Sequence, residues 1–249
     1  MKYMLLIYGD KSRTDKERAD CTAEGLETID RLRSQGKFID AAPLEPVSTA
    51  VTVRVRDGQM LVTDGPFAET TEQLGGYFVL DLADLDEAIA VASGFPPARW
   101  GAVEIRPMMT LDGLPPGRPA FGGTHAFTPF LLMCYDNEAA WRAAGDEARR
   151  AAMGEAVALT RQLAQDGSYL SAAPLHPAAT ATCVRVRDGK RVVTDGPFAE
   201  THEVLGGYYL IQAASREAAV RVAARHPGAR LGSVEVRAAI DLSRFRDRP

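Results

Sequence analysis

The sequence predicts an α+β fold made of two ferredoxin-like βαββαβ units whose sheets pack face to face within one chain. Three observations support this prediction. The chain contains an internal repeat, each copy shows the same order of strand and helix patterns, and the first strand of each copy is apolar throughout. Two helices can cover only one face of a sheet. The other copy is therefore the expected cover for the second face.

The repeat is clearest in the heptapeptide DGPFAET, which occupies residues 64–70 and recurs at 195–201. Other segments align at the same spacing, namely 53–58 with 184–189 and 74–77 with 205–208. The first strands, 3–8 and 130–135, align at a spacing shorter by four residues. We therefore expect four extra residues before or inside the first helix of the second copy.

The first copy opens with a strand and a helix. Residues 3–8 form a short apolar run, which is typical of a strand covered on both faces. A polar stretch follows with Leu26, Ile29 and Leu32 on one side, a spacing that predicts a helix. Gly36 is placed to end it as a C′ glycine.

A strand and a hairpin come next. Residues 38–44 read as a strand, and the valines of segment 51–55 alternate with polar residues, which predicts a strand with one buried face. Asp57-Gly58 is a two-residue hairpin turn that leads into a strand at 60–63.

The copy ends with a strand, a helix and a strand. Residues 77–82 are apolar, and Asp84 with Glu87 three positions later predicts a capping box. The helix that it opens runs through Val91 and closes at Gly94, and residues 102–108 form the last strand.

These elements give the domain organisation. The first copy spans 1–110 and the second spans 129–241, followed by a tail at 242–249. The segment 111–128 is rich in proline and glycine, so we interpret it as a linker. We expect the two halves to pair within the chain.

Composition excludes several classes of protein. The formal net charge of −4 and the absence of a basic run disfavour a nucleic-acid binder. Three cysteines without CxxC spacing predict neither a disulfide framework nor a zinc site, and a reducing cytoplasm fits them best. The apolar start is too short for a signal peptide, and no run reaches the length of a transmembrane helix, so we expect no membrane association. We also expect no metal and no cofactor.

The DGPFAET segments, the following Gly-Gly-Tyr triplets and the hairpin VRVRDG resemble the YCII-related (YciI-like) family, in the branch named for its DGPF motif. The resemblance covers both copies. It implies a dimeric α+β barrel, here fused into one chain, and a function without a settled reaction. It also implies a regulatory setting beside an extracytoplasmic-function sigma factor. Other members carry a His and Asp pair proposed as catalytic, and this chain has Gly25 and Ala156 at the position of the His.

Several residues of the motif segments are candidates for chemistry. We take Asp64, Glu69, Asp195 and Glu200 as candidate catalytic residues, because retained carboxylates can act as general acids or bases. Asp-Gly-Pro is also competent as a turn by itself, and this structural reading is favoured for the two aspartates. For the glutamates, the alternative is a loop carboxylate that accepts backbone N–H bonds.

Further residues are candidates for ligand binding, namely Glu72, Tyr77, Arg99, Glu203, Tyr208 and Arg230. Arg99 and Arg230 follow the second helices and suit an anionic group. The charged residues of the Arg-x-Arg and Glu-x-Arg strands, which begin at Arg54, Glu104, Arg185 and Glu235, are interpreted as ion pairs on a solvated face.

Two functions follow as hypotheses. The first is a protein that binds a small molecule or has a regulatory, accessory role, with clefts near the two DGPF loops. The second is a YciI-like enzyme that acts on a small metabolite through Asp/Glu acid–base chemistry, which requires Asp64, Glu69 and Tyr77 to converge on one pocket.

Overall fold

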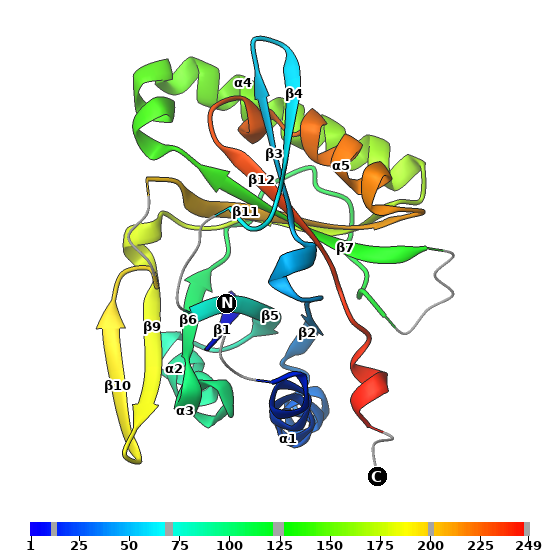
Figure 1. Ribbon diagram of the computed structural model, residues 1–249. Coiled ribbons are helices and arrows are strands. Elements are labelled where there is room, and N and C mark those ends of the chain that lie inside the picture. The colour runs from blue at the N-terminus through cyan, green and yellow to red at the C-terminus, as the bar shows by residue number, and fades with distance from the viewer. Residues whose placement is uncertain (11–13, 68–71, 122–126, 199–201, 247–249) are drawn as a thin grey trace.

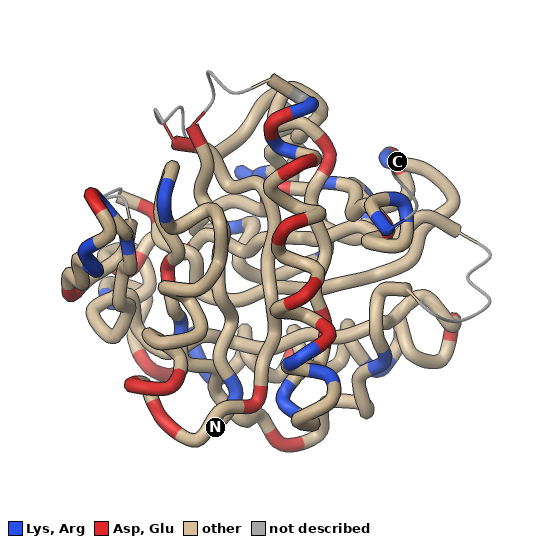
Figure 2. The backbone as a smooth tube through the Cα atoms, turned by 90° about the horizontal axis from the view of Figure 1, so that it is seen from below, with Lys and Arg blue, Asp and Glu red and all other residues tan. Residues whose placement is uncertain are grey.

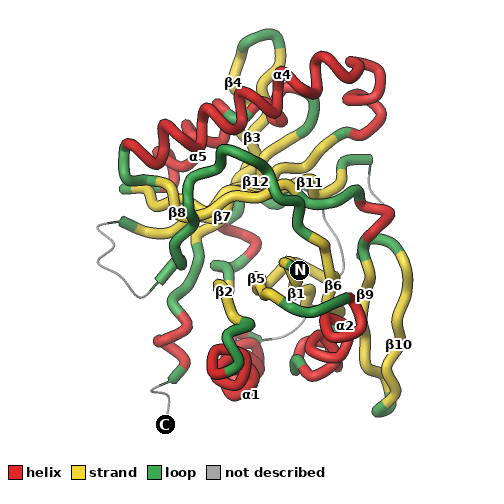
Figure 3. Tube along the Cα trace, turned by 180° about the vertical axis from the view of Figure 1, so that it is seen from behind, coloured by secondary structure: helices red, strands yellow, loops and turns green. Residues whose placement is uncertain are grey.

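A computed structural model describes residues 1–249 except 11–13, 68–71, 122–126, 199–201 and 247–249. The described residues form two six-stranded antiparallel sheets, with helices on the outer face of each (Figures 1 and 3). This confirms the predicted α+β fold of two ferredoxin-like halves. None of the described helices has the length and apolar character needed to cross a membrane.

The described residues of the first half form strands and α-helices in the order β1 (Lys2–Asp10), α1 (Asp15–Ser34), β2 (Phe38–Pro43), β3 (Val51–Arg56), β4 (Gln59–Asp64), β5 (Glu72–Asp81), α2 (Leu85–Gly94), α3 (Pro97–Trp100) and β6 (Ala102–Pro107). Its helix boundaries follow the predicted signals. Gly36 has a φ of +70° just after α1. Asp84 caps α2 by accepting the backbone N–H of Glu87, whose carboxylate accepts the N–H of Ala83.

The second half repeats this order as β7 (Thr128–Asp136), α4 (Glu138–Gln165), β8 (Tyr169–Pro174), β9 (Thr182–Arg187), β10 (Lys190–Asp195), β11 (Val204–Ala213), α5 (Arg216–Arg225) and β12 (Ser233–Ala238). Its first helix is longer and is interrupted at Gly145, which has a φ of +85°. The four extra residues are thus accommodated at the start of this helix.

Figure 2 views the molecule from the side of α1 and shows acidic and basic residues interspersed.

The two halves exchange their hairpins. The first sheet has the strand order β10-β9-β6-β1-β5-β2, and the second has the order β4-β3-β12-β7-β11-β8. The β3–β4 hairpin of the first half therefore extends the sheet of the second half, and β9–β10 extends the sheet of the first (Figure 1). The contact is made by β3 with β12 and by β9 with β6.

Arginines at the hairpin ends form hydrogen bonds that stabilise this exchange. Arg56 donates to the backbone oxygens of Ala229 and Gly232 at 2.7 and 3.0 Å. The equivalent Arg187 donates to the oxygen of Gly101 at 2.9 Å. These arginines therefore bond to carbonyl groups of the opposite half. Arg187 Nη2 also lies 4.0 Å from Glu72 Oε1, so an ion pair is present at this arginine, and its partner lies in the opposite half.

The sheets are also joined at their opposite edges. Leu44 at the end of β2 bridges to Ala239 beyond β12, and Met108 beyond β6 bridges to Leu175 beyond β8. Each sheet is thereby linked to the other at two corners, and the pair closes into a barrel. The implied dimeric α+β barrel is thus present within one chain.

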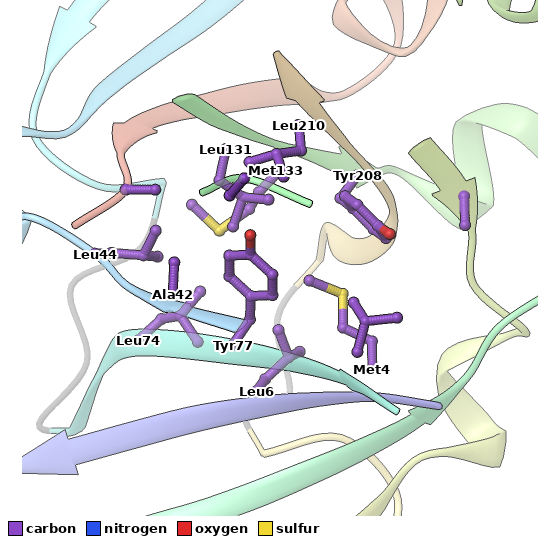
Figure 4. Packing of buried hydrophobic residues seen from close by; sticks show 14 of the residues in the cluster. Met4, Leu6, Ala42, Leu44, Leu74, Tyr77, Leu131, Met133, Tyr208 and Leu210 are labelled. Carbon is purple, nitrogen blue, oxygen red and sulfur yellow. The ribbon is translucent and has the colours of Figure 1, made fainter. Parts of the chain in front are cut away.

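The core between the sheets contains apolar residues from both halves. Met4 and Leu6 of β1 face Leu131 and Met133 of β7 across this space, and all four are fully buried. Figure 4 shows the rings of two tyrosines, Tyr77 and Tyr208, among them. Separate apolar clusters lie between each sheet and its outer helices. The predicted burial of the first strands on both faces is confirmed.

Candidate functional site

A pocket lies between the two halves, where equivalent residues of both copies meet. Its open space is about 650 Å³, including its mouth. The two DGPF segments contribute proline and phenylalanine from both copies, and the interior faces of the strands contribute charged and aromatic side chains. The charged and aromatic residues that line it include Tyr8, Phe67, Glu104, Arg106, Tyr135, Phe198, Glu235 and Arg237.

The hairpin exchange carries each DGPF phenylalanine to the opposite half. The ring of Phe67 stacks on Tyr135 with centroids 4.4 Å apart, and Phe198 stacks on Tyr8 at 4.1 Å. Gly65 has a φ of +103°, a backbone conformation that favours glycine, and its N–H donates to the oxygen of Ala50. The motif turn therefore aims the phenylalanine across the interface between the halves.

Each DGPF segment donates a backbone hydrogen bond to a buried glutamate. The N–H of Phe67 donates to Glu235 Oε2 at 2.9 Å, and the N–H of Phe198 donates to Glu104 Oε2 at 2.8 Å. Both glutamates are on strands next to the apolar first strands, with side chains on the interior face. The DGPF loop of each half is thus fixed by a carboxylate of the half to which its hairpin is exchanged.

Each buried glutamate is accompanied by a buried arginine two residues later. Arg106 Nη1 lies 3.2 Å from Glu104 Oε1, and Arg237 Nη1 lies 3.8 Å from Glu235 Oε1. All four side chains are nearly inaccessible to solvent. The interpretation of these pairs as a solvated face is wrong, because the second sheet covers the face on which they lie.

The arginines also bond to backbone oxygens. Arg106 Nη2 donates to the oxygen of His176 at 2.9 Å, and Arg237 Nη2 donates to that of Glu45 at 2.6 Å. The Nε atoms of both arginines are buried without a hydrogen-bond partner among the described residues. Each guanidinium therefore has one buried donor that no described acceptor satisfies, and an unpaired buried donor is costly.

Burial changes the acidity of the carboxyls. Desolvation raises the pKa of Glu104 and of Glu235, while the nearby guanidinium groups and the motif N–H bonds lower it. Burial also raises the pKa of Tyr8 and Tyr135 well above the usual value. The pocket thus combines two acids that hold a proton more readily than free glutamate with two neutral phenols.

Two of the predicted binding residues help to join the halves. Glu72 Oε2 accepts from Arg185 Nη2 at 2.8 Å, and Glu203 Oε2 lies 3.6 Å from Arg54 Nη2. Each pair links a hairpin to the half that receives it. Glu203 also lines the pocket and accepts from the hydroxyl of Ser233 at 2.6 Å.

The candidate catalytic residues lie elsewhere or outside the described part. Asp64 and Asp195 are exposed at the ends of β4 and β10, and neither is among the described residues that line the pocket. Glu69 and Glu200 lie outside the described residues. The expected convergence of Asp64 and Tyr77 is not seen, because Tyr77 is buried in the core between the sheets while Asp64 is exposed.

Tyr77 and Tyr208 occupy equivalent positions with different partners. The hydroxyl of Tyr77 donates to Asp40 Oδ2 at 2.8 Å, and the hydroxyl of Tyr208 lies 3.5 Å from Ser171 Oγ. Asp40 Oδ1 also accepts the backbone N–H of Ala120 in the linker segment. Burial raises the pKa of Asp40. Asp40 therefore connects the buried Tyr77 to the linker segment.

The two candidate anion-binding arginines make ion pairs at the surface. Arg99 pairs with Glu24 on α1, and Arg230 pairs with Glu155 on α4 at 2.9 Å. All four side chains are about half exposed. Both arginines thus lie on the outer helix side of the sheets rather than in the central pocket.

Sequence reasoning did not identify Glu104, Arg106, Glu235 and Arg237 as site residues. A signal was present in the repeat, because Val-Glu-Ile-Arg of the first copy recurs as Val-Glu-Val-Arg. These strands pair directly with the strands predicted to be buried on both faces. Within the described segments, no group of three or more His, Cys, Asp or Glu residues is arranged to hold a metal ion.

The family comparison agrees with the duplicated architecture. The YCII-related domain model matches residues 1–112 and again residues 128–243. An uncharacterised protein of Rhizobium meliloti (strain 1021) is 39% identical over 114 residues, which are 43% of this chain and 92% of that protein. A crystal structure described as a "Putative Chlorite dismutase" aligns over 98% of this chain and 97% of that chain, with a TM-score of 0.41 and 11% identity. The chain belongs to the YCII-related domain family and carries two copies of that domain in tandem.

Proposed function

We propose that this protein binds a small molecule in the pocket between its two halves. One observation supports the proposal above the others: equivalent residues of both copies line the same pocket. Stacked aromatic pairs provide apolar surface, and the two buried glutamate–arginine pairs provide polar groups. Sites for small ligands commonly combine apolar walls with a few fixed polar groups.

The lining residues define the ligand chemistry. Leu74, Leu205 and the stacked rings suit an apolar body. Arg106 and Arg237 also line the pocket, and their guanidinium groups suit an oxygen acceptor on the ligand. The proposed ligand is therefore a compact molecule with an apolar body and at least one carbonyl or carboxylate group.

A thermal-shift screen of metabolites tests the proposal. A ligand at about 100 times its Kd stabilises the folded state by about 2.7 kcal/mol, which raises Tm by about 5–10 °C for a chain of this size. We expect such a shift for the wild type. The double variant Phe67→Leu/Phe198→Leu keeps apolar side chains but removes the stacked rings, so we expect it to lose most of the shift.

The double variant Arg99→Gln/Arg230→Gln is the matched control. It removes two equivalent charged residues that are about half exposed and lie on the outer helix side of the sheets. The proposal expects this variant to keep the full ligand-induced shift. Loss of the shift in this control, with the shift retained in the phenylalanine variant, would place the ligand at the surface arginines and contradict the proposal.

Acid–base catalysis is the second candidate function. It is favoured by the raised pKa of Glu104 and Glu235, two carboxyls that line the pocket beside tyrosine side chains. Incubating a stabilising compound with the protein and analysing it by mass spectrometry separates the two functions. An unchanged compound supports binding alone, and conversion that is lost in Glu104→Gln/Glu235→Gln supports catalysis.

The regulatory role and the cellular location of this protein stay predictions. The family resemblance suggests a regulatory role beside an extracytoplasmic-function sigma factor. A cytoplasmic location is supported by Cys21, Cys134 and Cys183, which form no disulfide in the described chain.

A further inference from the structure

The outer strand of the first sheet, β10, has an exposed edge. Among the described strands it pairs only with β9, and all six of its residues are exposed. The side chains of Val192 and Val193 are 43% and 41% exposed. An exposed edge that carries β-branched apolar residues is a template for pairing with another strand.

The hairpin turn determines which backbone groups of β10 point outward. Asp188 and Gly189 both have positive φ values, 50° and 70°, as in a two-residue turn that is flanked by a hydrogen-bonded pair. Hydrogen-bonded and non-hydrogen-bonded pairs then alternate along the hairpin. With Lys190 paired to Arg187, the residues whose N–H and C=O groups point away from β9 are Arg191, Val193 and Asp195.

These three residues are complementary to a second copy of themselves. An antiparallel pairing about a twofold axis must place outward-pointing residues opposite one another. When the twofold axis passes between Val193 of one copy and Val193 of the other, each Arg191 lies opposite the Asp195 of the second copy. The pairing then has a valine–valine contact at its centre and one arginine–aspartate pair on each side, all on one face of the sheet. Both charged residues are exposed in the single chain.

The equivalent edge strand, β4, lacks this complementarity. Its outward-pointing residues are Met60, Val62 and Asp64, so a twofold pairing about Val62 places each aspartate opposite a methionine. A mixed pairing of β4 with β10 gives one ion pair rather than two, and it is heterologous, so it can extend from copy to copy without closing. The β10 edge is therefore the better of the two for self-association.

We propose that two copies of this protein associate through β10, in antiparallel register about Val193. The first sheets of the two copies then form one continuous sheet of twelve strands, since each contributes six. The central pocket is not part of this interface, so the proposal is independent of the proposed ligand binding.

Light scattering coupled to size-exclusion chromatography tests the association. We expect the mass of the wild type to rise with concentration from 26.9 kDa toward twice that value. Val193→Pro removes an outward-pointing N–H without removing a bond to β9, so we expect the association constant to fall at least about tenfold. Val62→Pro makes the same change on β4 and is expected to associate like the wild type.

A charge exchange tests the register directly. Arg191→Asp places like charges opposite one another, and Asp195→Arg does so with the opposite sign, so each is expected to weaken association about tenfold. The double variant Arg191→Asp/Asp195→Arg restores both ion pairs and is expected to associate like the wild type. A wild type that stays at the mass of one chain at submillimolar concentration overturns the proposal. Association that is sensitive to Val62→Pro but not to Val193→Pro also overturns it.

Discussion

Replacing Arg106 by methionine is expected to lower the free energy of unfolding by about 3–5 kcal/mol. The substitution leaves the buried Glu104 carboxylate without its cation, 3.2 Å away in the wild type, and leaves the oxygen of His176 without a donor. A buried charge that loses its partner is costly because water cannot solvate it. Denaturant unfolding monitored by circular dichroism measures the change.

Arg99→Met is the control for that experiment. It removes an arginine–glutamate pair from the surface, where both side chains are about half exposed. Exposed pairs contribute about 0–1 kcal/mol, so a small effect is expected. Equal losses in the two variants would contradict the burial of the Glu104–Arg106 pair between the sheets.

Asp136→Asn is expected to stabilise the protein at pH 8 but not at pH 3.5. Burial raises the pKa of Asp136 to about 6, an effect increased by Glu138 and Glu203 and opposed by Trp141 and Arg149. The pKa of Asp136 is therefore higher in the folded state than in the unfolded state. The contribution that the protonated Asp136 makes to the free energy of unfolding of the wild type is complete below about pH 4 and is lost as the pH rises through 6. A pKa shift of this size corresponds to a change of about 3 kcal/mol in the free energy of unfolding. Partial exposure of the Asp136 side chain reduces this change to about 2 kcal/mol.

The measurement is the difference in unfolding free energy between pH 3.5 and pH 8, for the variant and the wild type in parallel. Using the difference cancels any effect of the substitution that does not depend on pH. The hydrogen bond from the indole N–H of Trp141, 3.0 Å long in the wild type, can be kept because asparagine also presents an acceptor oxygen. An identical pH dependence in both proteins would show that Asp136 ionises normally.

Most of the fold follows from local sequence signals. The apolar run of β1, the glycine after α1 and the cap at Asp84 each act within a few residues, so the sequence predicts them directly. The hairpin exchange is different. Residues 51–64 form the same β3–β4 hairpin whichever sheet they join, and the choice depends on where the β12 edge lies in space.

The candidate site was less predictable for the same reason. The recurrence of DGPFAET in both copies draws attention to Phe67 but does not show what its ring contacts. Its partners, Tyr135 and Glu235, lie in the other copy and far along the chain. Glu-x-Arg on a strand has the same pattern whether its face meets water or a second sheet. Only the packing of the two sheets shows that these charges are buried.

The stoichiometry of ligand binding tests most directly whether the two halves share one pocket. Isothermal titration of the wild type with a compound from the thermal-shift screen counts the bound molecules per chain. Because both DGPF loops and both glutamate–arginine pairs line the same pocket, the expected result is one molecule per chain. Two equivalent molecules per chain would contradict this, since they would require a separate site at each DGPF loop.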